Sequence, residues 1–209
     1  MKNEAICYIV GAGEDYGLDF VPHTGDYVIA ADGGYDRLLA AGIEPQLVIG
    51  DFDSLGRTPQ AEHVLTLPRE KDVTDTWAAI EQGKARGYRT FWLYGCTGGR
   101  IEHTLANIQT LTALAEENMT GVLVDEHQLI TAMGPGTREF PASAKGYVSV
   151  FAASDRCCGV WLRGLKYELS DGTLTNRFPL GVSNEFQGIP SSVSVGEGVA
   201  ILVFDRDCH

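Results

Sequence analysis

The sequence lacks any long apolar run, since no hydrophobic stretch approaches the ~20 residues that a membrane helix requires. Its first residues also lack the layout of a secretory signal peptide. Basic residues are scarce, with 16 Lys and Arg against 28 Asp and Glu, which gives a formal net charge of −12. Because an acidic surface repels nucleic acid and anionic membranes, we expect neither as a partner.

Cysteine is sparse and follows no known pattern. There are five cysteines, an odd number, and none forms a Cys-x-x-Cys pair. Adjacent cysteines such as Cys157 and Cys158 rarely suit a disulfide or a zinc site. We therefore expect reduced, mostly buried thiols in a cytoplasmic protein.

The composition is that of a globular protein, with 44% hydrophobic and 21% charged residues over 209 positions. Up to residue 128, strand-like and helix-like stretches alternate. Strands are expected at 5–10, 27–31, 47–49, 64–67, 90–94 and 122–124, and helices at 34–41, 74–86 and 100–117. This rhythm predicts an α/β domain at 1–128 with a mostly parallel sheet covered by helices.

The pattern changes after residue 126. Short strand-like runs recur at 129–133, 147–152, 159–162 and 199–204, and turn signals separate them at 134–136, 170–172 and 188–190. No convincing helix is expected there. This pattern predicts an all-β sandwich as the second domain, at 129–209.

An acidic turn, Gly-Asp-Phe-Asp-Ser at 50–54, follows the expected strand 47–49. Ligands of open α/β sheets gather beyond the carboxyl ends of strands. If Gly50 lets the chain bend, Asp51 and Asp53 point to one side and suit Mg²⁺, which prefers oxygen ligands. Taken alone, the turn fits a solvated loop equally well.

Further charged residues stand at similar places. Asp32 follows the strand 27–31 and precedes the flexible pair Gly33 and Gly34. Asp72 and Asp75 flank Thr74, a good N-cap at the start of a helix, although acids favour helix starts for structural reasons as well. Lys71 could meet a phosphate, or be an ordinary surface lysine.

A glycine-rich turn containing Gly98 and Gly99 joins the strand 90–94 to the helix 100–117. N–H groups at a helix start attract phosphate, although the turn lacks the P-loop Lys-Ser/Thr. A polar stripe on this helix follows, and we expect it to donate to phosphate or base edges. The stripe is Arg100, His103, Asn107 and Thr110. The apolar stripe, expected to be buried, is Ile101, Leu105, Ile108, Leu111 and Ala115.

The order and spacing of these motifs closely resemble the thiamine pyrophosphokinase family. The segment Gly-Val-Ser-Asn-Glu-Phe at 181–186 is similar to that family's late substrate motif. The resemblance implies transfer of diphosphate from ATP to thiamine, which gives AMP and thiamine diphosphate. It also implies an enzyme that uses Mg²⁺ and forms a homodimer with ATP and thiamine as ligands.

The resemblance further implies residue roles. Mg²⁺ would be held by Asp51, Asp53 and Asp75, with Asp32 and Asp72 nearby. Phosphate charge would be neutralised by Lys71 and Arg100, and the thiamine pyrimidine would contact Ser183 and Asn184. The nucleotide would also meet Gly33, Gly34, Thr74, Gly98, Gly99, His103 and Asn107.

Two departures keep alternatives open. Glu102 stands where many bacterial members carry Asp, and no Trp near the C-terminus offers a stacking surface for thiamine. The sequence does not identify the general base among the aspartates. The alternatives are a diphosphotransferase that acts on a thiamine-like alcohol and a non-catalytic sensor of nucleotide or thiamine.

Overall fold

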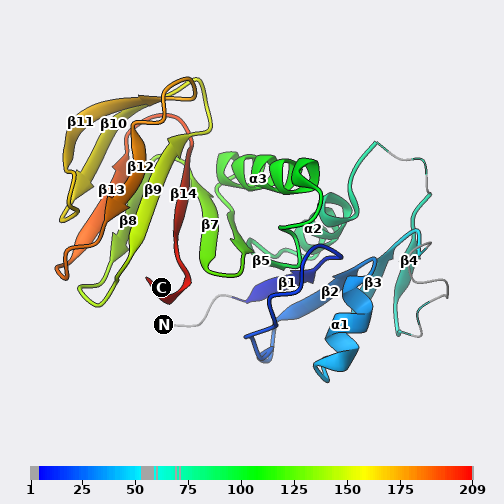
Figure 1. The fold of residues 1–209 in the computed structure, drawn as a ribbon. Coiled ribbons are helices and arrows are strands. Elements are labelled where there is room, and N and C mark those ends of the chain that lie inside the picture. Colours follow the sequence, from blue (N-terminus) through cyan, green and yellow to red (C-terminus); the bar gives the residue numbers. More distant parts are fainter. Residues whose placement is uncertain (1–4, 53–58, 60, 69, 71, 209) are drawn as a thin grey trace. The chain divides into compact units, whose positions relative to one another are not determined.

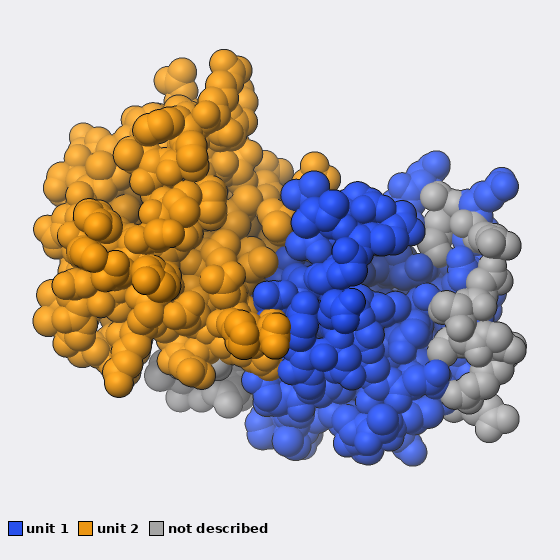
Figure 2. All heavy atoms as spheres, in the orientation of Figure 1, with its two compact units in different colours: residues 1–107, 123–125 blue, residues 108–122, 126–209 orange. Residues whose placement is uncertain are grey.

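The computed structural model describes residues 5–52, 59, 61–68, 70 and 72–208. The chain divides into two compact units, coloured separately in Figure 2. Unit 1 comprises Met1–Asn107 and Leu123–Asp125, and unit 2 comprises Ile108–Val122 and Glu126–His209. The division into domains at residue 128 stays a prediction, because compactness alone does not define an independently folding segment.

Unit 1 contains a parallel sheet in the order β5-β1-β2-β3-β4. Its strands are β1 (Ile6–Val10), β2 (Tyr27–Ala31), β3 (Leu47–Gly50), β4 (Val64–Thr66) and β5 (Thr90–Tyr94). Strands β1, β2 and β3 are almost wholly buried, which explains their continuous apolar sequences. The helices α1 (Gly34–Ala40) and α2 (Asp75–Ala85) cover this sheet from its two faces (Figure 1).

Helix α3 (Ile101–Glu116) and strand β6 (Thr120–Val124) contribute residues to both units. The predicted face of α3 is partly wrong. Ile101 and Leu105 are 67% and 55% exposed, whereas Asn107 and Thr110 are about 95% buried. Polar side chains can occupy a buried helix face where they find hydrogen-bond partners, and the Asn107 amide bonds the carbonyl oxygen of Cys96.

Unit 2 is built from antiparallel strands, and the predicted β-sandwich is confirmed. Strands β12-β9-β14-β7 are neighbours in this order within the ten-stranded sheet, and a separate four-stranded sheet has the order β11-β10-β13-β8. The strands are β7 (Gln128–Met133), β8 (Gly136–Phe140), β9 (Tyr147–Ala152), β10 (Arg156–Arg163), β11 (Leu169–Thr175), β12 (Gly181–Glu185), β13 (Ser191–Val195) and β14 (Ala200–Asp205), followed by the 3-10 helix η1 (Arg206–Cys208). Phe140 of β8 meets Phe204 of β14 edge-on at 5.2 Å between the sheets.

One predicted turn in unit 2 is wrong. Residues 170–172 lie inside β11 rather than between strands. Asp171 has a φ of 51°, and the pairing of β10 with β11 shifts register beside Gly172. These are the marks of a β-bulge, which takes up turn-forming residues without ending the strand.

The remaining expectations concern membranes and thiols. Within the described ranges, no helix is long and apolar enough to cross a membrane. All five cysteines are unpaired, and only Cys158 is not fully buried. The expectation of mostly buried thiols is therefore confirmed.

Candidate active site

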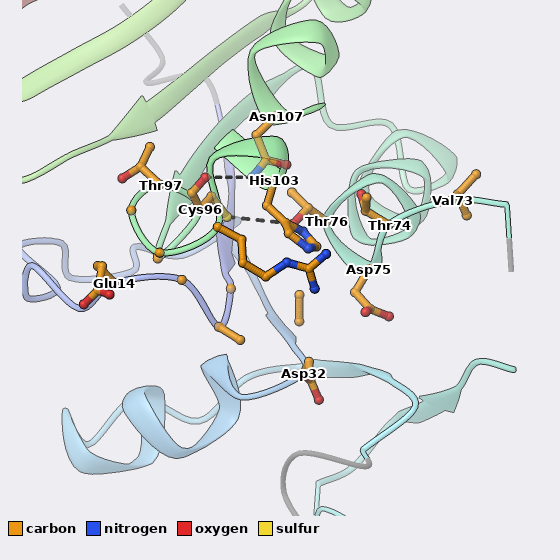
Figure 3. Close-up of a pocket in the computed structure, with 18 of the residues that line it drawn as sticks. Glu14, Asp32, Val73, Thr74, Asp75, Thr76, Cys96, Thr97, His103 and Asn107 are labelled. Carbon is orange, nitrogen blue, oxygen red and sulfur yellow. Dashed lines mark hydrogen bonds between the residues drawn. The ribbon is translucent and has the colours of Figure 1, made fainter. Parts of the chain in front are cut away.

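A cavity of about 890 Å³ opens in unit 1 beyond the carboxyl ends of the parallel strands. Figure 3 shows Glu14 and Thr97 on one side of it, with Val73, Thr74 and Asp75 on the other. Asp32 lies on a third side. All the residues that line it belong to unit 1.

The structure brings most of the predicted site residues together in this cavity. It is lined by Asp32, Asp51, Asp72, Thr74, Asp75, Gly98, Gly99, Arg100, His103 and Asn107. Asp53 and Lys71 lie outside the described residues. Gly33 and Gly34 are not among the lining residues, and Ser183 and Asn184 belong to unit 2.

The strand ends at Asp32 and Asp51 are shaped by tight backbone geometry. Asp32 has a φ of 51° and donates its N–H to the carbonyl oxygen of Ile49 at 2.8 Å. Gly50 was expected to supply the bend of the acidic turn, but the left-handed residue is Phe52, with a φ of 59°. Gly50 instead allows close packing, since an added Cβ would stand 3.2 Å from Cα of Asp32.

The start of α2 supplies the next side of the cavity. Thr74 is confirmed as the N-cap, and its side chain accepts a hydrogen bond from the N–H of Trp77 at 3.1 Å. Asp72 and Asp75 stand on either side of this cap and both line the cavity. Their position near the helix N-terminus stabilises negative charge.

Replacing Thr74 by Ala should lower the free energy of unfolding by about 1 kcal/mol, because the N–H of Trp77 loses its acceptor. Urea unfolding measures this change. Thr74→Ser keeps the hydroxyl and should stay close to wild type. Equal stability of the Ala variant and the wild type would show that the cap bond contributes nothing.

The glycine turn between β5 and α3 forms the side of the cavity on which Thr97 lies. Gly95, Gly98 and Gly99 all have positive φ angles, between 55° and 73°, that other residues rarely adopt. Asn107 supports the turn, as its Nδ2 donates to the carbonyl oxygen of Cys96 at 2.7 Å. Thr97 is held by a 2.6 Å bond from its hydroxyl to Asp125. The predicted phosphate-binding amide of Asn107 is therefore engaged in supporting the turn.

Arg100 and His103 are the predicted site residues in the cavity that can carry positive charge. The Nε of Arg100 donates to Oε1 of Glu102 at 2.6 Å, and both side chains are more than half exposed. The pKa of Glu102 is held below its usual value by a hydrogen bond from its own backbone N–H and then by Arg100. The longer side chain at position 102 thus reaches the arginine.

Cys96 also lines the cavity, but its thiol is unreactive. Burial raises the pKa of its thiol to about 11, although Thr76 lies 3.9 Å away as a hydrogen-bond partner. The thiol is therefore protonated at neutral pH and is a poor nucleophile. It serves as a packed part of the wall.

Sequence reasoning missed the loop 11–14, which also lines the cavity. Its Gly-Ala-Gly pattern does not continue as a dinucleotide-binding motif, because Tyr16 occupies the third glycine position. The place of the loop follows from its backbone hydrogen bonds to Tyr94 at the end of β5 and to Gly95 and Thr97 in the turn beyond it.

The cavity fits a hard divalent cation. Its four aspartates Asp32, Asp51, Asp72 and Asp75 offer the oxygen donors that Mg²⁺ prefers. Within the described part of the chain, no three His, Cys, Asp or Glu side chains already stand together as a metal-binding cluster. Mg²⁺ tolerates this, since it keeps several waters and takes further ligands from substrate phosphates.

In unit 2, Asn184 and Ser183 differ sharply. The Asn184 amide is buried and bonds both backbone groups of Tyr167, accepting from its N–H at 2.9 Å and donating to its carbonyl oxygen at 2.7 Å. Ser183 is exposed, has a φ of 57°, and donates its N–H to Ser149 Oγ at 3.0 Å. The geometry gives Asn184 a structural role and leaves the Ser183 side chain at the surface.

Fold and cavity together define an α/β enzyme-like domain with an acidic, glycine-bordered site, joined to a β-sandwich. Residues 22–123 match the family model "Thiamin pyrophosphokinase, catalytic domain", and residues 138–200 match "Thiamin pyrophosphokinase, vitamin B1 binding domain". The two matches cover most of the chain. The chain belongs to the thiamin pyrophosphokinase family.

Individual relatives agree with this assignment. The thiamine pyrophosphokinase of Bacillus subtilis (strain 168) is 28% identical over 213 residues, which cover 98% of this chain and all of the relative. A crystal structure of the B. subtilis enzyme has a TM-score of 0.84, at 28% identity over 97% of this chain and 99% of that one. The crystal structure of the thiamin pyrophosphokinase from Geobacillus thermodenitrificans has a TM-score of 0.82, at 28% identity over 98% of this chain and 100% of that one.

The family assignment confirms the resemblance noted in the sequence. The chain is an enzyme, so the alternative of a non-catalytic sensor is excluded. The family also supports the formation of thiamine diphosphate from thiamine as its activity.

Proposed function

We propose that the chain transfers the diphosphoryl group of ATP to the hydroxyl of thiamine, releasing AMP, in a reaction that requires Mg²⁺. One observation carries the proposal. Four aspartates and a glycine turn line a single cavity, within the segment that matches the catalytic-domain model. Acidic side chains and a phosphate-binding turn in one cavity suit a nucleotide that arrives as its magnesium complex.

Each part of the cavity then has a role. Asp51 and Asp75, together with the predicted Asp53, would hold Mg²⁺, which would neutralise charge on the phosphates. The turn at Gly98 and Gly99 and the side chain of Arg100 would meet phosphate oxygens. Alignment and charge neutralisation supply most of the catalysis in phosphoryl transfer, and a nearby carboxylate takes the proton of the attacking hydroxyl.

The acceptor and the nucleotide are tested together by product analysis. Chromatography of a reaction with ATP, Mg²⁺ and thiamine should show AMP and thiamine diphosphate in equal amounts. A panel of alcohols that share only part of thiamine tests the alternative acceptor. If another alcohol reacts faster than thiamine, the assignment of thiamine as substrate is wrong.

Substitutions at Ser183 and Asn184 should have different effects, the first on substrate binding and the second on stability. Ser183→Ala should raise the KM for thiamine several-fold with unchanged unfolding, because the hydroxyl is exposed. Asn184→Ala should lower the free energy of unfolding by about 2 kcal/mol, since both backbone groups of Tyr167 lose a buried partner. Steady-state kinetics and urea unfolding measure the two effects, and the opposite assignment of effects would contradict these roles.

We further propose that the enzyme is a cytoplasmic homodimer. The unpaired state of all five cysteines supports a reducing compartment. Exposed apolar side chains on unit 2, Tyr167, Phe178, Leu180 and Val182, support an interface. Light scattering after size-exclusion chromatography should give twice the mass of the chain, and a monomer would contradict the proposal.

A further inference from the structure

The guanidinium of Arg37, on α1, is bonded to every carbonyl of the loop 11–14. Its Nη1 donates to the carbonyl oxygens of Gly11 at 3.1 Å and Glu14 at 3.3 Å. Its Nη2 donates to those of Ala12 at 3.4 Å and of Gly13. One side chain therefore donates hydrogen bonds to the carbonyl oxygens of four consecutive residues.

The loop is also held by the end of β5 and by the glycine turn that follows it. The N–H groups of Gly11 and Gly13 donate to the carbonyl oxygens of Tyr94 and Gly95, at 2.8 and 2.7 Å. The N–H of Glu14 donates to Thr97 at 3.0 Å. All four loop residues line the cavity, so these bonds set the shape of one cavity wall.

Arg37 also lies against the glycine turn. A side chain added at Gly95 would overlap Nη1 of Arg37 and the carbonyl oxygen of Gly11. The guanidinium is thus packed where α1, the loop 11–14 and the start of the turn 95–99 meet. It is half-buried and is not among the residues that line the cavity.

We propose that Arg37 is a positioning residue for nucleotide binding. It does not touch the ligand, but it holds the loop 11–14 against the glycine turn so that the cavity wall is formed before the nucleotide arrives. A pre-formed wall raises the affinity for the ligand, because the loop is already ordered and its ordering does not reduce the free energy of binding. This inference rests on the proposed ATP-dependent function.

Only a guanidinium suits this role. It presents five donors in a rigid planar fork, whereas the lysine ammonium is a compact charge on a flexible stem. Arg37→Lys keeps the charge but cannot span four carbonyl groups. If geometry is what matters, the Lys variant should behave like Arg37→Ala.

The test compares Arg37→Ala and Arg37→Lys with a control, Arg86→Ala. Arg86 lies in the same unit, and its hydrogen bonds go to Gln82 of α2 rather than to the loop. Calorimetry on the full-length protein measures binding of Mg²⁺-ATP without thiamine, and kinetics measure kcat and both KM values. Hydrogen exchange reports the amides of the loop.

We expect both Arg37 variants to bind ATP about tenfold more weakly or worse, because the loop must then be ordered when the nucleotide binds. The KM for thiamine should stay within twofold, and exchange should quicken in residues 11–14 but not in β5. The control should match wild type in all three measurements. If Arg37→Ala does not fold, ATP binding by Arg37→Lys tests the proposal.

Three outcomes would overturn the inference. They are ATP binding by both variants within twofold of wild type, full restoration by lysine, and unchanged exchange in the loop. Failure of the wild-type protein to bind ATP would instead overturn the proposed function. The exchange measurement needs no nucleotide, so the two failures are distinguishable.

Discussion

Replacing Asp51 by Asn should lower turnover by roughly 10²–10³-fold, the size of effect seen when a group that stabilises transition-state charge is removed. Asp51 lines the cavity directly after β3, and Asp32, Asp72 and Asp75 line the same cavity. Asparagine keeps the shape of the side chain but cannot offer a charged oxygen to Mg²⁺. The kcat at saturating Mg²⁺ and substrates measures the loss.

The fold should survive the same change. Four aspartates in one cavity repel one another, so removing one charge should leave the melting temperature equal or higher. Glu44→Gln, which removes an exposed carboxylate of the same unit outside the cavity, should keep full activity. Cooperative unfolding lost in Asp51→Asn would mean that this aspartate is structural.

Replacing Gly34 by Ala should destabilise unit 1 by about 3 kcal/mol or more, because overpacking of a tight backbone contact forces the chain to shift. Gly34 begins α1, and an added Cβ would overlap the carbonyl oxygen of Val10 on β1. The helix can approach β1 so closely only when residue 34 has no side chain. Urea unfolding and the yield of folded protein measure the loss.

The neighbouring glycine provides the matched control. At Gly33 an added Cβ would meet only Ala12, with the Cβ of Ala12 at 3.3 Å and its Cα at 3.9 Å, and the φ of −60° at Gly33 suits any residue. Gly33→Ala should therefore cost within about 1 kcal/mol. Equal losses at the two positions would show that the close approach of α1 to β1 is not what requires Gly34.

The strands at 27–31, 90–94 and 147–152 could be predicted to the residue. Each is a short apolar run bounded by polar or glycine residues, so pattern and structure agree. Strands β8, β12 and β13 were missed because they carry many polar residues. In β11 the local signal of Asp171 and Gly172 indicated a turn, but the partner strand β10 pairs across a bulge.

Helix α3 shows how tertiary contacts override a sequence pattern. Two polar residues, Asn107 and Thr110, lie one position from the apolar series and share its spacing. Sequence alone cannot decide which series faces inward. The bond from Asn107 to Cys96 decides it, because a satisfied amide can be buried while Ile101 and Leu105 remain exposed.

Part of the candidate site could be predicted from the positions of its acids in the sequence. Acids at strand ends converge by a general rule of parallel sheets, so Asp32 and Asp51 could be placed together, with Asp75 at the start of helix α2 near the same edge. The loop 11–14 could not, because it acts through backbone groups. Its bonds to Arg37 join residues that are 23 to 26 positions apart in the chain.

Position-specific phosphate labelling tests the central proposal most directly. With ATP labelled in the α-, β- or γ-phosphate in separate reactions, β- and γ-label should both appear in the thiamine product, and α-label should remain in AMP. Without thiamine, label should stay in ATP. Transfer of γ-label alone, with ADP as the second product, would contradict diphosphoryl transfer.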